Sequence, residues 1–137
     1  MSRPILLDTC ALLWVAANEE LAGSAEAALQ EMEPKAGGIA VSPISAWEIG
    51  QLIAKGRLRL PLDPSRWFQA VLDGGMTLAP MPAAVLVASS FLPSGRLRDP
   101  ADKILAATAR AFDYRLMTRD QLLLGFADDG HMQAIAC

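Results

Sequence analysis

The residues of this 137-residue sequence with the clearest chemical potential are five acids beside short apolar runs: Asp8, Glu48, Asp99, Asp102 and Asp120. Asp8 follows the apolar run 5–7, and Asp120 lies just beyond the run 115–118. In open α/β sheets, ligands bind beyond the carboxyl ends of the strands, so acids in such places can meet. Converging carboxylates repel one another, and some of their pKa values rise unless a positive charge neutralises them.

A hard divalent cation, Mg²⁺ or Mn²⁺, supplies that charge and binds through oxygen ligands alone. The one histidine, His131, cannot form a zinc site by itself. A metal held by carboxylates, with open positions, suits phosphodiester hydrolysis, because it polarises a phosphoryl oxygen and lowers the pKa of a water. The sequence contains no Ser-centred nucleophile elbow, no GxxxxGK[ST] loop and no GxGxxG fingerprint.

Three of these acids also have a purely local explanation. Pro100 suits the first turn of a helix, which makes Asp99 a good N-cap. Asp102 then lies in the first helical turn, where the helix dipole favours a carboxylate. Ser45 and Glu48 fit a capping box, with Ser at the N-cap and Glu three residues later. From the residues alone, the local and the chemical interpretations both stay open.

Short apolar runs alternate with helical patterns along the chain. We expect strands at 5–8, 39–41, 77–79, 115–118 and 132–136. We expect helices over 9–15, 24–32 with Ser24 as N-cap, 42–55, 63–73, 82–89 and 100–112, with a helical turn or a stub at 122–124. This alternation predicts an α/β fold, with a central, mainly parallel sheet of four to five short strands flanked by helices. The length predicts a single domain over residues 1–137.

Composition places the chain among globular proteins. Apolar residues make up 53% and charged residues 20%, and the apolar runs are too short for a membrane span. The first residues lack the apolar core of a signal peptide, and Cys10 and Cys137 have no motif spacing. We therefore expect a cytoplasmic protein, with a Cys10–Cys137 disulfide as the alternative.

The net charge of −3 would normally argue against nucleic acid as a partner. Removing the five candidate acids from the fifteen in the chain leaves ten, against twelve Lys and Arg. If those five acids hold divalent cations, the remaining surface is slightly basic. Net charge therefore does not exclude RNA.

Other side chains have both a binding and a structural interpretation. Basic residues that could follow a phosphate backbone, or simply form a solvated face, are Lys55, Arg57, Arg59, Arg96 and Arg98. Trp14, Trp47 and Trp67 could stack on bases, or pack in the core or at a dimer face. Leu12, Val15 and Leu29 could bind a partner helix or pack in the core.

Four acidic blocks, in order along the chain, resemble those of PIN-domain ribonucleases. They are residues 6–9 (LLDT), 41–49 (VSPISAWEI), 98–109 (RDPADKILAATA) and 116–120 (LMTRD). The length and the Trp-Glu and Arg-Asp-Pro-x-Asp blocks most resemble VapC toxins of type II toxin–antitoxin modules. Each block alone is weak, but the four together are specific. Residues 60–95 carry no family motif.

The resemblance implies a Mg²⁺-dependent endoribonuclease, with Mn²⁺ as a substitute and one or two ions in the site. It also implies a homodimer and a VapB-type antitoxin whose C-terminal segment enters the active-site groove. The acidic quartet of the family is matched by Asp8, Glu48, Asp102 and Asp120. Asp8, Asp102 and Asp120 would be metal ligands, and Glu48 would bind a second metal or orient the attacking water.

Three further residues match auxiliary positions of the family. Asp99 matches an additional acid, Thr118 a small hydroxyl residue beside the metal-site acids, and Thr9 a similar hydroxyl from the first strand. Arg98, Arg96 and Trp47 are candidates for contact with RNA or antitoxin. Two alternatives remain: a PIN-type RNA-processing nuclease outside a toxin pair, and a non-catalytic RNA- or protein-binding module with a structural metal.

Overall fold

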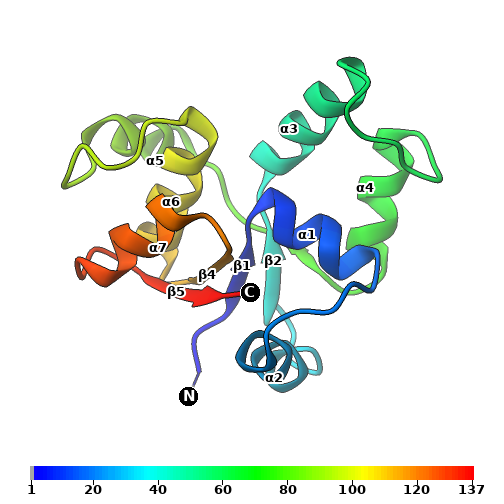
Figure 1. The fold of residues 1–137 in the computed structure, drawn as a ribbon, viewed down its shortest axis with the longest axis horizontal. Coiled ribbons are helices and arrows are strands. Elements are labelled where there is room, and N and C mark those ends of the chain that lie inside the picture. The colour runs from blue at the N-terminus through cyan, green and yellow to red at the C-terminus, as the bar shows by residue number, and fades with distance from the viewer. Residues whose placement is uncertain (1) are drawn as a thin grey trace.

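The computed structural model describes residues 2–137 and contains one five-stranded parallel sheet (Figure 1). The strands are β1 (Ile5–Leu7), β2 (Ile39–Val41), β3 (Thr77–Leu78), β4 (Arg115–Thr118) and β5 (Gln133–Ala136). They lie in the order β3-β2-β1-β4-β5, and every neighbouring pair is parallel. Parallel neighbours require crossover connections, which the helices provide. The predicted α/β class is confirmed.

Seven α-helices and one 3₁₀ helix connect the strands within residues 2–137. They are α1 (Thr9–Ala16), α2 (Gly23–Met32), α3 (Pro43–Ala54), α4 (Pro64–Asp73), α5 (Ala83–Ala88), η1 (Ser89–Phe91), α6 (Pro100–Phe112) and α7 (Gln121–Asp128). In Figure 1, α5, α6 and α7 lie on one side of the sheet, and α1 and α4 lie on the other. Among residues 2–137, no helix combines the length and apolar character needed to cross a membrane.

Both faces of the three central strands, β1, β2 and β4, are largely buried, which explains why these strands are mainly apolar. Ile5 and Leu7 of β1 face a core that includes Leu12 of α1 and Trp67 of α4. Between them, Leu6 faces the opposite core, formed largely by α6 and α7. For Leu12 and Trp67, packing in the core is therefore the correct interpretation.

The strand order reverses between β1 and β4, the two neighbours at the centre of the sheet. From β1 the chain proceeds outward through β2 to β3, and then returns to start β4 on the other side of β1. Leu7 pairs with Met117, and the Asp8 N–H donates to the Met117 carbonyl at 3.1 Å. Residues that follow β1 and β4 therefore meet where open α/β sheets bind their ligands.

The predicted start of α3 at Ser42 is confirmed, whereas the predicted cap of α2 and one alternative capping motif are wrong. Ser24 does not cap α2, which begins at Gly23 after Ala22, and a carboxylate oxygen of Glu26 accepts the Leu21 N–H instead. The Ser45–Glu48 capping box does not form either. Ser42 is the N-cap of α3 and accepts the Ile44 N–H at 3.1 Å.

The segment predicted as a helical turn or stub at 122–124 is longer, because it belongs to α7. Asp120 caps this helix by accepting the N–H groups of Leu122 and Leu123. The disulfide alternative is also wrong, because Cys10 is exposed, Cys137 is buried and both are free.

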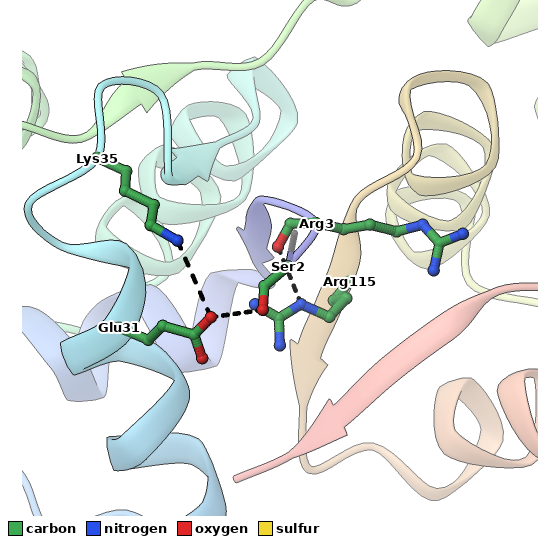
Figure 2. Close-up of polar contacts among 5 residues, drawn as sticks. All are labelled: Ser2, Arg3, Glu31, Lys35 and Arg115. Atoms are coloured by element: carbon green, nitrogen blue, oxygen red, sulfur yellow. Dashed lines mark hydrogen bonds and ion pairs between the residues drawn. The ribbon is translucent and has the colours of Figure 1, made fainter.

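The amino ends of the strands carry a small polar cluster (Figure 2). The Ser2 hydroxyl donates to Glu31 of α2 at 2.5 Å, and Lys35 Nζ lies 4.0 Å from the same carboxylate. Arg115 of β4 donates through Nε to the Arg3 carbonyl at 3.0 Å. These contacts attach the N-terminal segment to α2 and β4 at the end of the sheet opposite Asp8.

Candidate active site

A pocket of about 280 Å³ lies beyond the carboxyl ends of β1 and β4. Its lining consists of Asp8, Thr9, Cys10, Trp14, Glu48, Asp102, Leu105, Arg119 and Asp120. The fold therefore brings four of the five candidate acids to one pocket, from four separate parts of the sequence. The fifth acid, Asp99, lies outside this lining.

Asp8 is held rigidly at the base of the pocket. It is the N-cap of α1: Oδ1 accepts the Ala11 N–H at 2.7 Å, and Oδ2 accepts the Thr118 hydroxyl at 2.6 Å. Burial raises the pKa of Asp8, these two hydrogen bonds oppose the rise, and the charge of Asp120 adds to it. A positive charge bound next to Asp8 would offset this rise.

Thr118 connects two of the acids. Its hydroxyl donates to Asp8 and accepts the backbone N–H of Asp120 at 3.0 Å. Asp120 in turn caps α7 through Oδ1, at 2.9 Å and 3.0 Å. Thr118 is fully buried, so this arrangement fixes Asp8 and Asp120 relative to each other.

Glu48 projects from α3 toward α1 and is oriented by two hydroxyl groups. Thr9 donates to Glu48 Oε1. Because this uses the only hydroxyl proton of Thr9, Ser45 must donate in the 2.9 Å bond between Ser45 and Thr9. Burial raises the pKa of Glu48, the Thr9 bond opposes this, and Asp99 and Asp8 add to the rise.

The spacing of Ser45 and Glu48 is compatible with a capping box, but the structure gives Ser45 a different role. Ser45 and Glu48 lie three residues apart, on the same face of α3, and both contact Thr9. The three-residue spacing of Ser45 and Glu48 was the sequence signal that both side chains contact the same neighbour.

Asp99 and Asp102 have distinct positions on α6. Asp99 is the N-cap, as predicted, and accepts the Asp102 N–H at 3.0 Å. Asp102 lies in the first turn and lines the pocket. Burial raises the pKa of Asp102 to about 7, with further contributions from Asp99 and the other three acids of the pocket.

The three residues proposed for contact with RNA or antitoxin do not line the pocket. Arg98 is exposed just before α6, and Trp47 of α3 is 58% exposed. Arg96 pairs with Asp129 at 3.0 Å and packs over Gly125, where an added Cβ would lie 2.7 Å from Arg96 Nη1. Sequence reasoning missed Arg119, which does line the pocket; its place directly before Asp120 was the signal.

The chemistry of the donor set fits a hard divalent cation. Among residues 2–137, no preformed cluster of three or more His, Cys, Asp and Glu metal ligands is found. The pocket nonetheless offers four carboxylates from separate elements, and three of them have raised pKa values. An oxygen-binding cation would relieve that repulsion and bind to the lone pairs left free by the helix caps.

Comparison with known proteins identifies the class to which this fold and site belong. The model of the PIN domain family matches residues 5–127. The chain therefore belongs to the PIN-domain family, whose nucleases generally use divalent metal ions. It is 32% identical over 120 residues to Ribonuclease VapC22 of Mycobacterium tuberculosis (strain ATCC 25618 / H37Rv), covering 87% of this chain and 88% of that protein. This relation supports the VapC type predicted from the acidic blocks.

Solved structures with low sequence identity share the fold. VapBC2 from Rickettsia felis, bound to a promoter DNA fragment, aligns with a TM-score of 0.66 at 16% identity, covering 96% of this chain and 97% of that chain. PAE2754 from Pyrobaculum aerophilum aligns with a TM-score of 0.62 at 19% identity, covering 99% and 92%. FitAcB from Neisseria gonorrhoeae aligns with a TM-score of 0.58 at 20% identity, covering 96% of both chains.

Proposed function

We propose that this protein is an endoribonuclease that hydrolyses RNA phosphodiester bonds with Mg²⁺, for which Mn²⁺ substitutes. The observation that carries the proposal is the carboxylate pocket, in which Asp102 has its pKa raised to about 7 beside three other acids. Perturbed carboxylates in a cleft are typical of functional sites. Membership of the PIN-domain family supports the same reaction.

Asp8, Asp102 and Asp120 would hold the ion, and Glu48 would either hold a second ion or orient the attacking water. When bound, Mg²⁺ polarises the phosphoryl oxygen and lowers the pKa of water. Thr118 holds Asp8 in one orientation, as outer partners of metal ligands do. Thr9 and Ser45 do the same for Glu48.

We further propose that the protein is the cytoplasmic toxin of a type II toxin–antitoxin module and acts as a homodimer. A VapB-type antitoxin would neutralise it by inserting its C-terminal segment into the carboxylate pocket. The name of the 32% identical relative supports the toxin type. The Rickettsia felis VapBC2 structure, of the same fold, supports a VapB-type partner.

The test is RNA cleavage by the purified protein in Mg²⁺, Mn²⁺, Ca²⁺ or EDTA. We expect turnover in Mg²⁺ and Mn²⁺, little in Ca²⁺, whose looser coordination positions water poorly, and none in EDTA. Full activity in EDTA would overturn the metal mechanism. RNA binding without cleavage under every condition would favour a binding module instead.

The toxin assignment needs a separate test. We expect expression of the wild-type chain to arrest growth, and expression of the Asp8→Asn variant not to. Co-expression of a short antitoxin encoded next to this chain should restore growth. An RNA nuclease that cleaves in vitro but is neutralised by no neighbouring protein would instead be an RNA-processing enzyme outside a toxin pair.

A further inference from the structure

We propose that Arg119, held against Trp14, binds an RNA phosphate next to the scissile one at the carboxylate pocket. This inference rests on the proposed ribonuclease activity. It assigns a substrate-positioning role to Arg119, which is not one of the acids or auxiliary residues that match the family.

Arg119 lies in the short turn between β4 and α7, directly before the N-cap Asp120. Its side chain is exposed and lines the carboxylate pocket. Its Cζ atom lies 3.8 Å from the centroid of the Trp14 ring, and Nη2 donates to the Glu20 carbonyl at 3.4 Å. Trp14, on α1, lines the same pocket, so the cation and its platform both face the site.

The positive charge of Arg119 is not consumed by the acids around it. Arg119 takes part in none of the ion pairs found among residues 2–137. The aromatic ring holds the guanidinium without neutralising it, because a cation–π contact carries no opposite formal charge.

An RNA strand that approaches four carboxylates is repelled at every phosphate. A metal ion would compensate for the phosphate at which hydrolysis occurs, but its neighbour needs a separate cation. The planar guanidinium matches a phosphate through two parallel donors, and most of the five N–H donors of Arg119 remain available. Within residues 2–137, no other Lys or Arg lines this pocket.

The test uses a labelled single-stranded RNA that the wild type cleaves, with cleavage measured in Mg²⁺ and binding measured in Ca²⁺ at several salt concentrations. For Arg119→Gln we expect KM to rise about tenfold through the lost charged hydrogen bonds, with kcat little changed. The slope of log affinity against log salt should weaken by roughly 0.7, the value for one phosphate contact on a single strand. Arg119→Lys should keep the slope and recover part of the affinity.

Arg3→Gln is the matched control, since it removes the same charge at the amino end of the sheet, where Arg3 pairs with Asp113. We expect Arg3→Gln to leave KM and the salt slope unchanged. Trp14→Phe should raise KM less than Arg119→Gln, and the double variant should resemble Arg119→Gln alone, because Trp14 acts through Arg119. Thermal unfolding of each variant checks that it is folded.

The inference is overturned if the wild type cleaves the RNA while Arg119→Gln matches Arg3→Gln in KM and salt slope. It is also overturned if Arg119→Gln weakens only the affinity for an antitoxin, or if the Trp14 and Arg119 effects simply add. A wild-type protein that cleaves no RNA in any metal ion would instead overturn the proposed function itself.

Discussion

The two ends of the central sheet differ in whether their charged side chains have partners of opposite charge. At the carboxyl end, four acids line one pocket with no ion pair to any of them among residues 2–137. At the amino end, Glu31 accepts the Ser2 hydroxyl and lies near Lys35, while Arg3 pairs with Asp113 (Figure 2). The pKa of Asp102 rises to about 7, mainly through burial, whereas the Ser2 hydrogen bond lowers the pKa of Glu31.

This difference separates a binding site from structural polar contacts within one fold. The Glu31–Lys35 and Arg3–Asp113 ion pairs at the amino end are exposed, and each pair adds little to stability. At the carboxyl end Asp8 is buried and Glu48 and Asp102 are half-buried. No ion pair among residues 2–137 compensates their charges, so these acids oppose folding until a cation binds. Strand pairing and helix caps hold these carboxylates close together despite their mutual repulsion.

The largest expected effect is on catalysis. Asp8→Asn or Asp102→Asn should each lower RNA cleavage by about 100-fold or more, as loss of a key electrostatic group does. Asp102→Asn should leave the stability of the metal-free protein unchanged or raise it, because it relieves repulsion in the pocket. Asp8→Asn gains the same relief but loses the hydrogen bond from the Thr118 hydroxyl, because an amide nitrogen cannot accept it. Cleavage rates and urea unfolding in EDTA measure the two effects. An Asp102→Asn protein much less stable than wild type would make Asp102 a structural residue.

The second effect is the dependence of stability on pH. The folded pKa of Asp102, about 7, exceeds its ordinary value of 3.8, so the folded state binds this proton more tightly. Stability of the metal-free protein should therefore fall as pH rises from 3.8 to about 7, and level off above.

Urea unfolding in EDTA at about pH 5 and about pH 8 should differ by about 2 kcal/mol, after allowance for the partial exposure of Asp102. Asp102→Asn should remove most of this difference, and Asp8 and Glu48, whose pKa values are also raised, account for the rest. Stability equal at both pH values in the wild type would contradict the crowding of charge at the carboxyl end.

The third prediction distinguishes Asp99, as a helix cap, from Asp102, as a metal ligand. Asp99→Ser keeps a capping oxygen, so stability should hold while activity falls modestly through a weaker field at the pocket. Asp99→Ala should also cost about 1 kcal/mol of stability, because the cap to the Asp102 N–H is lost. Asp102→Ser should abolish turnover with little effect on the fold. If Asp99→Ser is inactive and Asp102→Ser is active, the two roles are reversed.

The smallest effect is expected at the amino end. Glu31→Gln removes an exposed carboxylate, so activity should not change and the unfolding temperature should fall only slightly. Because the pKa of Glu31 is lowered from 4.5, its contribution is present above that pH and is lost on acidification. Thermal unfolding of Glu31→Gln and wild type should therefore converge in acid. A loss of activity would mean that the two ends of the sheet are coupled.

Most of the fold was predictable, because its signals are local. The apolar run 5–7 predicted β1, and Pro100 predicted the start of α6 with its Asp99 cap. The start of α2 was misassigned, because Ser24 is a good cap by type but the chain becomes helical one residue earlier. The extent of α7 was missed, because Asp120 was considered only as a metal ligand although it also caps that helix.

The sequence by itself determined which elements form and which acids follow the strands, since strand periodicity and capping depend on neighbouring residues. Tertiary structure decided which of these side chains meet. Ser45 contacts Thr9 across 36 positions, and Arg119 of the β4–α7 turn lies on Trp14 of α1. Such contacts follow from the strand order, which places β2 and β4 on either side of β1. No local pattern encodes that order, because it is set by the burial of both faces of the sheet at once.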